Sequence, residues 1–371
     1  MRIAFDAKRI FKNKTGLGNY GRMIVKGILH CCPNDELFLC TPSTFGEHEN
    51  DFLKQKNVHI IEPQGISGRF PRLWRTLNNG IDDELNISVF HGLSQELPLQ
   101  LPGNVRKVVT IHDLIPWRYP HFFSVFDRTI YKQKVRHACK VANKVVAISQ
   151  QTASDLIEIL NVPQEKIKVV YQSCDDIFRK PVSEAERNSA IAKYGLPERY
   201  IACVGTVERR KNQVSVVRAM RWLPDDMHIM FFGRRTSYAK EVLEEAEKMN
   251  VGARVRIFDN ADFHDFPAIY SAAELSVYMS VFEGFGIPVL ESLATGTPVV
   301  TSSVSSMPEA GGDAALYAEA TSPEDIAMQC NKILGDSDFK EKFLQKSVAQ
   351  CLKFSPENII TELRGLYTEL C

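Results

Sequence analysis

Short apolar runs alternate with longer segments of helical periodicity along most of the chain. The runs have the period-two alternation of strands and are bounded by loops rich in glycine, proline and polar residues. In the first half they predict strands at Arg2–Asp6, Leu37–Thr41, Val58–Ile61, Ile87–Phe90, Val105–Thr110, Lys144–Ile148 and Lys166–Tyr171. In the second half they predict strands at Tyr200–Gly205, His228–Gly233, Val255–Phe258 and Leu275–Met279, with helices at Ala185–Tyr194, Lys240–Met249, Glu324–Leu334 and Pro356–Leu370. This alternation is typical of α/β domains with parallel sheets.

The length of the chain suits two such domains. It has 371 residues, of which 44% are hydrophobic, so each half can bury a full core. The polar stretch from Gln172 to Ser183 contains Pro181, and we interpret it as a linker. We therefore expect one domain at 1–176, a second at 177–354, and a terminal amphipathic helix within 355–371.

Composition and charge exclude several classes of protein. Lys and Arg total 45, as do Asp and Glu, so no overall charge favours nucleic acid. The nine cysteines include no C-x-x-C pair, and we assign them no disulfide or zinc chemistry. The first residues, Met1–Asp6, become charged before an apolar signal core could form, and no apolar run is long enough to cross a bilayer. We expect a cytoplasmic protein.

The residue pattern of one stretch, from Leu275 to Thr301, predicts a strand, a turn, a helix and a second strand. Gly284 and Gly286 free the backbone after the strand, and Pro288 suits the first turn of a helix that ends near Gly296. The N-terminus of such a helix presents backbone amides and the positive end of the helix dipole. The stretch therefore predicts an anion site, most simply a phosphate site.

Two acids flank the predicted anion site. Glu283 precedes the amides, and Glu291 lies about two turns into the helix. A carboxylate beside bound phosphate is repelled unless it accepts hydrogen bonds, and sugar hydroxyls are the obvious donors. The predicted ligand combines phosphate and sugar.

The two acids also carry a family resemblance. Their spacing, in the context Phe282-Glu283-Gly284-Phe285-Gly286-Ile287-Pro288, resembles the E-x7-E signature of glycosyltransferase family 4, the group 1 glycosyltransferases. The segment Gly296-Thr297-Pro298-Val299-Val300 adds to the resemblance, and an ordinary βα turn is the alternative. The resemblance implies the glycosyltransferase B fold, in which two doubly wound Rossmann-like domains face a central cleft. It also implies that 1–176 is the acceptor-side domain, that 177–354 binds the nucleotide sugar, and that 355–371 crosses back to the first domain.

A second glycine motif, Gly16-Leu17-Gly18-Asn19-Tyr20-Gly21, opens the first long predicted helix. It is formally G-x-G-x-x-G, but a polar loop, Lys8–Thr15, separates it from the strand. Asp35 and Glu36 precede the next strand instead of closing it, which disfavours a dinucleotide site. By resemblance to the family's glycine loop, we expect Gly16 and Gly18 to let the backbone approach a ligand in the cleft.

Two histidines follow predicted strands, where parallel sheets place ligand groups. The segment from His112 to Pro116 resembles the family's segment that contacts the donor sugar, which makes His112 a candidate sugar contact. A structural hydrogen bond is the alternative for His112, and it is the favoured interpretation for His91.

The loop from Thr206 to Asn212 follows another strand and carries three adjacent cations. Arg210 and Lys211 resemble the family's element that binds the donor phosphates, and they could neutralise a leaving pyrophosphate. One departure matters. Many members have Arg directly after the strand glycine, where this chain has Thr206, so Arg209 or Arg210 would have to substitute.

Taken together, the residues and the resemblance assign a donor site without a metal. The acid pairs Asp82-Asp83, Asp175-Asp176 and Asp225-Asp226 lie outside the predicted strand ends, so we expect no metal and no cofactor besides the donor. The expected catalytic residues are Glu283, His112, Arg210 and Lys211. The expected donor-binding residues are Gly16, Gly18, Thr206, Arg210, Lys211, Glu283, Gly284, Phe285, Gly286, Ile287 and Glu291.

The function implied is a retaining hexosyltransferase that uses a nucleotide diphosphate sugar. The segments Thr206-Val207-Glu208 and Ile115–Pro120 resemble those of bacterial mannosyltransferase-like members, which suggests mannose from GDP-mannose as donor. Glucosyl, galactosyl and N-acetylhexosaminyl transferases are similar in these segments, so their donors stay open. The resemblance implies a glycan or lipid-linked glycan as acceptor. Synthesis of a bacterial surface polysaccharide, such as lipopolysaccharide or capsule, would be its setting. A sugar-nucleotide epimerase of the same fold and a catalytically silent glycan-binding subunit remain as alternatives.

A basic segment, residues 118–144, bears on where the protein acts. Cations recur at four-residue spacing from Arg128 to Lys144, next to aromatic residues. Arg69, Arg72, Trp74 and Arg75 could extend the same patch. A solvated helix face is the simpler interpretation, and contact with the inner face of the cell membrane is the alternative.

Overall fold

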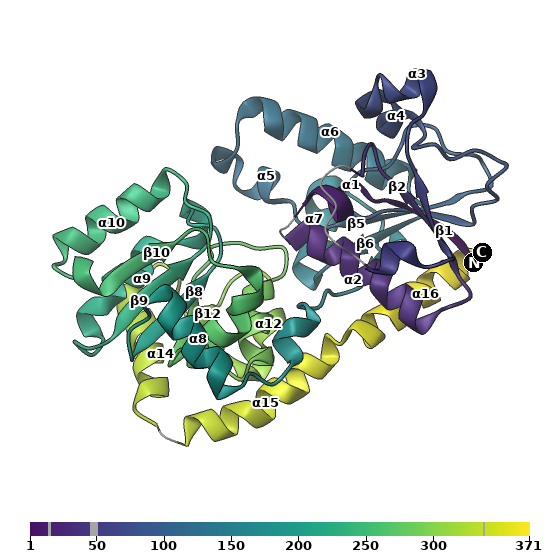
Figure 1. Ribbon diagram of the computed structural model, residues 1–371. Coiled ribbons are helices and arrows are strands. Elements are labelled where there is room, and N and C mark those ends of the chain that lie inside the picture. The colour runs from purple at the N-terminus through teal and green to yellow at the C-terminus, as the bar shows by residue number, and fades with distance from the viewer. Residues whose placement is uncertain (14–15, 45–50, 337) are drawn as a thin grey trace. The chain divides into compact units, whose positions relative to one another are not determined.

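The computed structural model describes residues 1–13, 16–44, 51–336 and 338–371. The chain divides into two compact units, Met1–Ser173 together with Phe354–Cys371, and Cys174–Lys353. The domain limits expected at 176 and 354 fall close to these divisions. The terminal segment belongs to the first unit (Figure 1).

The first unit is built on a seven-stranded sheet in the order β3-β2-β1-β4-β5-β6-β7. All of its pairings are parallel, as the alternation of strands and helices predicts. Successive strands run outward from β1 in one direction and from β4 in the other, so the sheet has a topological switch point between β1 and β4. The strands are β1 Arg2–Asp6, β2 Glu36–Cys40, β3 Val58–Ile61, β4 Val89–Gly92, β5 Arg106–Ile111, β6 Lys144–Ala147 and β7 Ile167–Val169.

Helices cover this sheet, and the last one comes from the far end of the chain. In Figure 1, α16 lies beside α2, where a Cβ on Gly27 would lie 2.5 Å from Ile360 Cγ1. This close approach explains why glycine stands at position 27. The α-helices of the unit are α1 Lys8–Lys12, α2 Gly16–Cys31, α3 Gly65–Gly68, α4 Pro71–Leu77, α5 Ile115–Arg118, α6 Val125–Val141, α7 Gln150–Leu160 and α16 Pro356–Leu370.

The expectation of a polar loop at Lys8–Thr15 was wrong for its first part, because Lys8–Lys12 form helix α1. Ile10 and Phe11 are buried in the core of the unit, and this burial stabilises a turn of helix within a sequence rich in lysine. Lys14 and Thr15 lie outside the described residues.

The second unit is built on a six-stranded parallel sheet in the order β10-β9-β8-β11-β12-β13. Its topological switch point lies between β8 and β11. The strands are β8 Tyr200–Val204, β9 His228–Phe232, β10 Val255–Phe258, β11 Leu275–Tyr278, β12 Val299–Ser302 and β13 Leu316–Ala318. The α-helices are α8 Glu184–Tyr194, α9 Gln213–Ala219, α10 Tyr238–Lys248, α11 Phe266–Ala272, α12 Ile287–Ala294, α13 Met307–Gly311, α14 Pro323–Leu334 and α15 Phe339–Lys353.

In the part of the chain that the structure describes, no helix is both long enough and apolar enough to span a membrane.

Candidate active site

The candidate site lies at the switch point of the second sheet. The loops after β8 and β11 meet there, which is where open parallel sheets place their ligands. Gly205, with φ of 137°, directly follows β8, and a Cβ on Gly233 would lie 2.2 Å from the backbone oxygen of Gly205. This contact between backbones fixes where the loop that carries Arg210 and Lys211 begins.

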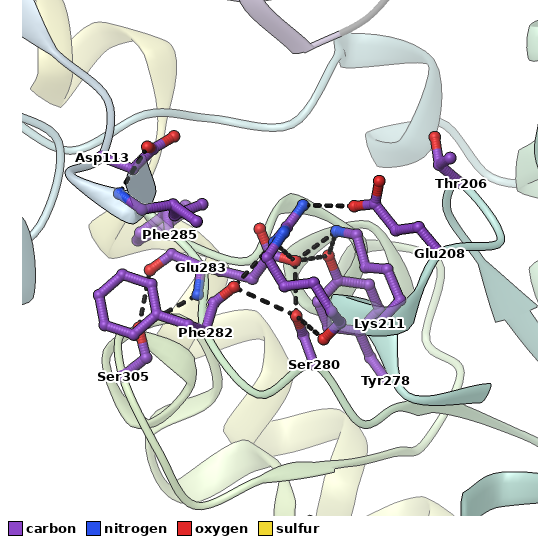
Figure 2. A network of polar contacts seen from close by, with 12 residues as sticks. Asp113, Thr206, Glu208, Lys211, Tyr278, Ser280, Phe282, Glu283, Phe285 and Ser305 are labelled. Atoms are coloured by element: carbon purple, nitrogen blue, oxygen red, sulfur yellow. Dashed lines mark hydrogen bonds and ion pairs between the residues drawn. The ribbon is translucent and has the colours of Figure 1, made fainter. Parts of the chain in front are cut away.

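Four side chains converge on one oxygen of Glu283, as the dashed lines of Figure 2 trace. The Oε1 atom accepts hydrogen bonds from Ser280 Oγ at 2.7 Å and from Tyr278 OH at 2.9 Å. It also forms ion pairs with Arg210 Nη1 at 2.5 Å and with Lys211 Nζ. The sequence therefore brings together the acid and the two cations that it predicts, across 72 residues of chain in the case of Lys211.

The charges of this cluster shift the pKa values of its members. Burial raises the pKa of Glu283, but Lys211 and Arg210 outweigh that effect and lower it from 4.5 to about 2. Burial lowers the pKa of Lys211, and the Glu283 carboxylate opposes that change. Burial, followed by the Glu283 charge, holds the pKa of Tyr278 well above its usual range. At neutral pH Glu283 is therefore an ionised acceptor and Tyr278 a neutral donor.

Arg210 also links the loop after β8 to the loop after β11. Its Nη1 donates to the backbone oxygen of Phe282 at 2.7 Å, and its own backbone oxygen accepts from Val281 N at 2.9 Å. Its Nη2 pairs with Glu208 Oε1 at 2.6 Å. On the far side of Glu283, Ser305 Oγ donates to the Glu283 backbone oxygen at 2.7 Å. The carboxylate is thus held at both its side chain and its backbone.

Thr206 stands apart from this network in Figure 2. Its backbone oxygen accepts from Gln213 Nε2 at 3.0 Å. Arg209 turns away as well, because its guanidinium pairs with Glu241 Oε1 at 2.5 Å and both side chains are largely exposed. Of the two substitutes considered for the arginine that Thr206 replaces, the structure places only Arg210 at Glu283.

The glycine turn before α12 has a packing role that the sequence does not reveal. Gly286 has φ of 120°, and a Cβ there would lie 2.8 Å from Met307 Cε. Glycine at 286 is therefore required by backbone conformation and by Met307. Phe285 is buried, and its backbone oxygen accepts from Ser306 Oγ at 2.7 Å. Ile287 begins the helix, next to Gly284-Phe285-Gly286.

Glu291, the second acid of the motif, is buried on α12. Its Oε2 accepts a hydrogen bond from Tyr270 OH at 3.2 Å. Burial raises the pKa of Glu291 from 4.5 to about 7, with the Tyr270 bond opposing. The two acids of the E-x7-E motif thus differ in their titration, since Glu283 is ionised at neutral pH whereas burial brings the pKa of Glu291 up to about 7.

The histidines of the first unit are both buried. His112 Nε2 donates to the Leu93 backbone oxygen at 2.9 Å, and its ring packs edge-on against Tyr20. Burial lowers its pKa to about 4, so the ring is neutral at pH 7. His91 bonds Tyr367 OH at 2.6 Å and Thr110 Oγ1 at 2.8 Å, so both of its ring nitrogens are used within the core.

The two candidate glycines of α2 differ. A Cβ on Gly16 would meet nothing within 4 Å, whereas one on Gly18 would lie 1.9 Å from the Asn13 backbone oxygen. Gly18 is therefore needed for local packing, while Gly16 has open space beside it.

The basic segment is only partly available for binding. Lys132 and Arg136 lie over the Trp117 ring, at 5.1 and 5.8 Å from its centroid. The suggestion that Trp74 and Arg75 extend the patch was wrong, because Trp74 is buried and Arg75 is enclosed by carboxylates.

Several site residues were not singled out from the sequence. Tyr278 and Ser280 contact the Glu283 carboxylate, and Ser305 and Ser306 hold its backbone. Their signal in the sequence is position, since Tyr278 ends the strand before the motif and Ser280 lies two residues further on. In the described ranges, no three His, Cys, Asp or Glu side chains gather in a way that could hold a metal ion.

Comparison with solved structures defines the class of the protein. The structure of the Anabaena protein HepE in complex with UDP and glucose superposes with a TM-score of 0.75, at 16% identity and with all of both chains covered. The chain has the glycosyltransferase B fold, with two parallel-sheet Rossmann-like units.

Comparison of sequences gives the family. The family model of the group 1 glycosyl transferases matches residues 186–348, and that of glycosyltransferase family 4 matches residues 34–176. The chain belongs to this family, as its E-x7-E motif predicts. It is 28% identical to the O-antigen chain mannosyltransferase B of Escherichia coli, with 99% of both chains covered. It is also 28% identical to the Escherichia coli serotype-specific mannosyltransferase WbdA, over 73% of this chain and 35% of that protein.

Proposed function

We propose that the protein transfers mannose from GDP-mannose to a glycan or lipid-linked glycan during synthesis of a bacterial surface polysaccharide, with retention at the anomeric carbon. The likeness to the O-antigen chain mannosyltransferase B over nearly the full length supports the sugar and the setting. The observation that carries the chemistry is the cluster of Arg210, Lys211 and Glu283 at the switch point of the second sheet.

In this proposal the two cations stabilise the departing diphosphate. Arg210 and Lys211 are balanced by Glu208 and Glu283 in this cluster. A guanidinium has five N–H donors and an ammonium three, so both can bind phosphate oxygens while they keep their contacts with Glu283. The backbone amides and dipole at the start of α12 add positive potential.

Glu283 binds hydroxyls of the transferred sugar instead of attacking it. All four side-chain contacts described above fall on Oε1, so Oε2 is the oxygen suited to accept from a sugar hydroxyl. A carboxylate with a pKa near 2 is a strong acceptor but a poor base at neutral pH. A front-face displacement follows, in which a phosphate oxygen of the leaving group takes the proton of the acceptor hydroxyl.

Glu291 accepts hydrogen bonds from the ribose of the donor. Burial raises the pKa of Glu291 to about 7, so two ribose hydroxyls that donate to the carboxylate would favour its ionised form. His112 binds the sugar through Nδ1, because its Nε2 already donates to Leu93. Gly16, which has open space beside it, lets the backbone approach the donor.

No metal takes part in the proposed reaction, because Arg210 and Lys211 neutralise the leaving group. Transfer should therefore continue in excess EDTA. A loss of activity that Mg²⁺ or Mn²⁺ restores would overturn this part of the proposal.

Donor use is tested by thermal shift with UDP-, GDP- and ADP-sugars, followed by transfer of labelled mannose to an acceptor extract. Stabilisation by GDP-mannose and labelled polymer are expected. The test variant is Glu283→Gln, which loses the carboxylate paired with Arg210, and its control is Glu241→Gln, which loses the carboxylate paired with Arg209. Both arginines belong to the loop after β8. Full turnover by Glu283→Gln, with normal donor affinity, would refute the role of Glu283.

A further inference from the structure

The first unit has a cavity at the switch point of its own sheet. The cavity has a volume of about 250 Å³ and is lined by residues of four segments, one of which is α4 with the turn that follows it. Asp6 ends β1, Glu96 follows β4, and α6 contributes His137. β1 and β4 are the neighbours at which the strand order reverses, and ligands of open parallel sheets bind at that point.

A buried ion network forms one wall of the cavity. Arg75 Nη2 pairs with Asp6 Oδ2 at 2.5 Å, and its Nη1 pairs with Glu96 Oε2 at 2.6 Å. Lys134 Nζ lies 3.0 Å from Glu96 Oε1. Asp6 is 3% exposed and Arg75 11%, so this pair is held rigidly out of bulk water. Two cations and two carboxylates balance, which leaves the cavity without the excess positive charge that a phosphate needs.

Two buried polar atoms of the lining have no hydrogen-bond partner among the described residues, namely Asn79 Oδ1 and His137 Nε2. Asn79 is 1% exposed, and a buried polar atom without a partner costs about 1–3 kcal/mol. An amide oxygen accepts, and a ring nitrogen donates or accepts according to its tautomer. A ligand that satisfies both therefore needs groups that donate and accept, as hydroxyls do.

Size and apolar lining narrow the ligand further. The volume far exceeds the ~10–15 Å³ that one water needs and falls just below the ~300 Å³ at which pockets for small molecules begin. Leu97, Pro98 and Leu99 line the same cavity. Carboxylates, an amide and an apolar wall suit one sugar ring, with hydroxyls on its edge and C–H groups on its faces.

We propose that this cavity binds a single uncharged pyranose ring of the acceptor glycan, through Asp6, Glu96 and Asn79. The inference rests on the proposed function for the identity of the ligand as acceptor. The division of roles follows from charge: the cluster at Arg210 and Lys211 suits a diphosphate, and the balanced cavity of the first unit suits a neutral sugar.

The test uses methyl α-D-mannopyranoside as the probe, with binding followed by saturation-transfer NMR on the full chain. Thr76 lines the cavity, is exposed, and donates to a backbone oxygen four residues earlier. Thr361 is exposed on α16 of the same unit and makes the same bond, so Thr361→Phe is a matched control for the cavity-filling Thr76→Phe. Asn79→Gly removes the amide at a position whose φ of 56° suits glycine.

Wild type and Thr361→Phe should bind the probe, while Thr76→Phe and Asn79→Gly should lose it. Transfer by those two variants should show an acceptor kcat/KM at least about tenfold lower, or about 1.4 kcal/mol. Their stabilisation by the nucleotide sugar should not change. No probe signal with wild type, or an equal signal with Thr76→Phe, would overturn the inference.

The inference and the proposed function fail in different ways. If no nucleotide sugar stabilises the protein, the proposed function fails, while binding of the probe still reports on the cavity. If transfer proceeds with an unchanged acceptor KM in Thr76→Phe, the cavity proposal fails and the transfer reaction stands.

Discussion

Replacement of Glu283 by glutamine tests the electrostatics of the second unit directly. A glutamine side chain has nearly the shape and the neutrality of a protonated glutamate, so the variant loses what the pKa shift of Glu283 measures. That pKa falls from 4.5 to about 2, and at about 1.4 kcal/mol per unit this corresponds to about 3 kcal/mol. The amide oxygen still accepts from Ser280 and Tyr278, so the loss comes from the ion pairs with Arg210 and Lys211.

Hydrogen exchange of the β8 and β11 amides measures the opening of this unit by itself. At pH 7 the free energy of opening should fall by about 3 kcal/mol in Glu283→Gln. The control Glu241→Gln removes a largely exposed ion pair with Arg209 and should cost less than about 1 kcal/mol.

The pH dependence of the free energy of opening is a second measure of this stabilisation by Glu283. The folded-state pKa of Glu283 is depressed, so the stabilisation is complete above pH 4.5 and is lost as the pH falls from 4.5 towards 2. The difference in the free energy of opening between wild type and Glu283→Gln should therefore become smaller as the pH falls from 4.5 towards 2. Equal exchange of wild type and Glu283→Gln at pH 7, or a difference that stays constant down to pH 3, would show that the ion pairs of Glu283 do not stabilise this unit.

Three further predictions concern other parts of the chain. Burial raises the pKa of Glu291 to about 7, so its contribution to stability is full below pH 4.5 and is lost as the pH rises through 7. Glu291→Gln should therefore be more stable than wild type at pH 8 but not at pH 4. Urea unfolding at the two pH values measures this difference, and its absence would contradict the buried position of Glu291. Gly233→Ala should destabilise the second unit by about 2–4 kcal/mol because its Cβ would overlap the Gly205 oxygen, and wild-type exchange in β8 and β9 would argue against that. Val125 is 68% exposed beside the cations of α6 and should contact anionic membranes. Val125→Asp should therefore lower co-sedimentation with phosphatidylglycerol vesicles, whereas the control Val348→Asp, at a valine that is 61% exposed on α15, should leave it unchanged. Equal effects of the two variants would count against membrane contact through α6.

The sheets could be predicted from the sequence because their strands alternate or are continuously apolar. Every strand of the first sheet lies where the pattern puts it, to within two residues. The inner strands are largely buried, whereas the edge strands β3 and β7 are partly exposed and are recognised by their short apolar runs. Helix α15, Phe339–Lys353, was missed. Two of its buried positions are polar, Ser347 and Gln350, and Gln350 is satisfied by the backbone oxygens of Glu309 and Ala310. Because polar residues stand at buried positions of α15, its apolar residues do not follow the helical periodicity that the sequence analysis relies on. The backbone oxygens that satisfy Gln350 belong to another segment and cannot be recognised from the local sequence.

The site was predictable as a set of loops but not as a set of contacts. Lys211 and Glu283 were singled out because each follows a strand, and the strand order then brings them together. The expectation that Gly286 serves the ligand missed its packing on Met307, because nothing local in the sequence reports a contact with the following helix. The hydroxyls of Tyr278 and Ser280 were missed for a similar reason, since a strand end gives no sign of which carboxylate lies opposite.

Helix α16 also sets the order in which the chain can be completed during its synthesis. The first unit needs Phe354–Cys371, and Tyr367 in that segment bonds the buried His91. The whole second unit, Cys174–Lys353, is made in between, which takes on the order of ten seconds or more at ribosomal rates. Until then the nascent first unit carries an open apolar groove along α2. The unit that emerges first is therefore finished last, and the apolar residues of α2 that pack on α16 stay uncovered until the end of the chain is made.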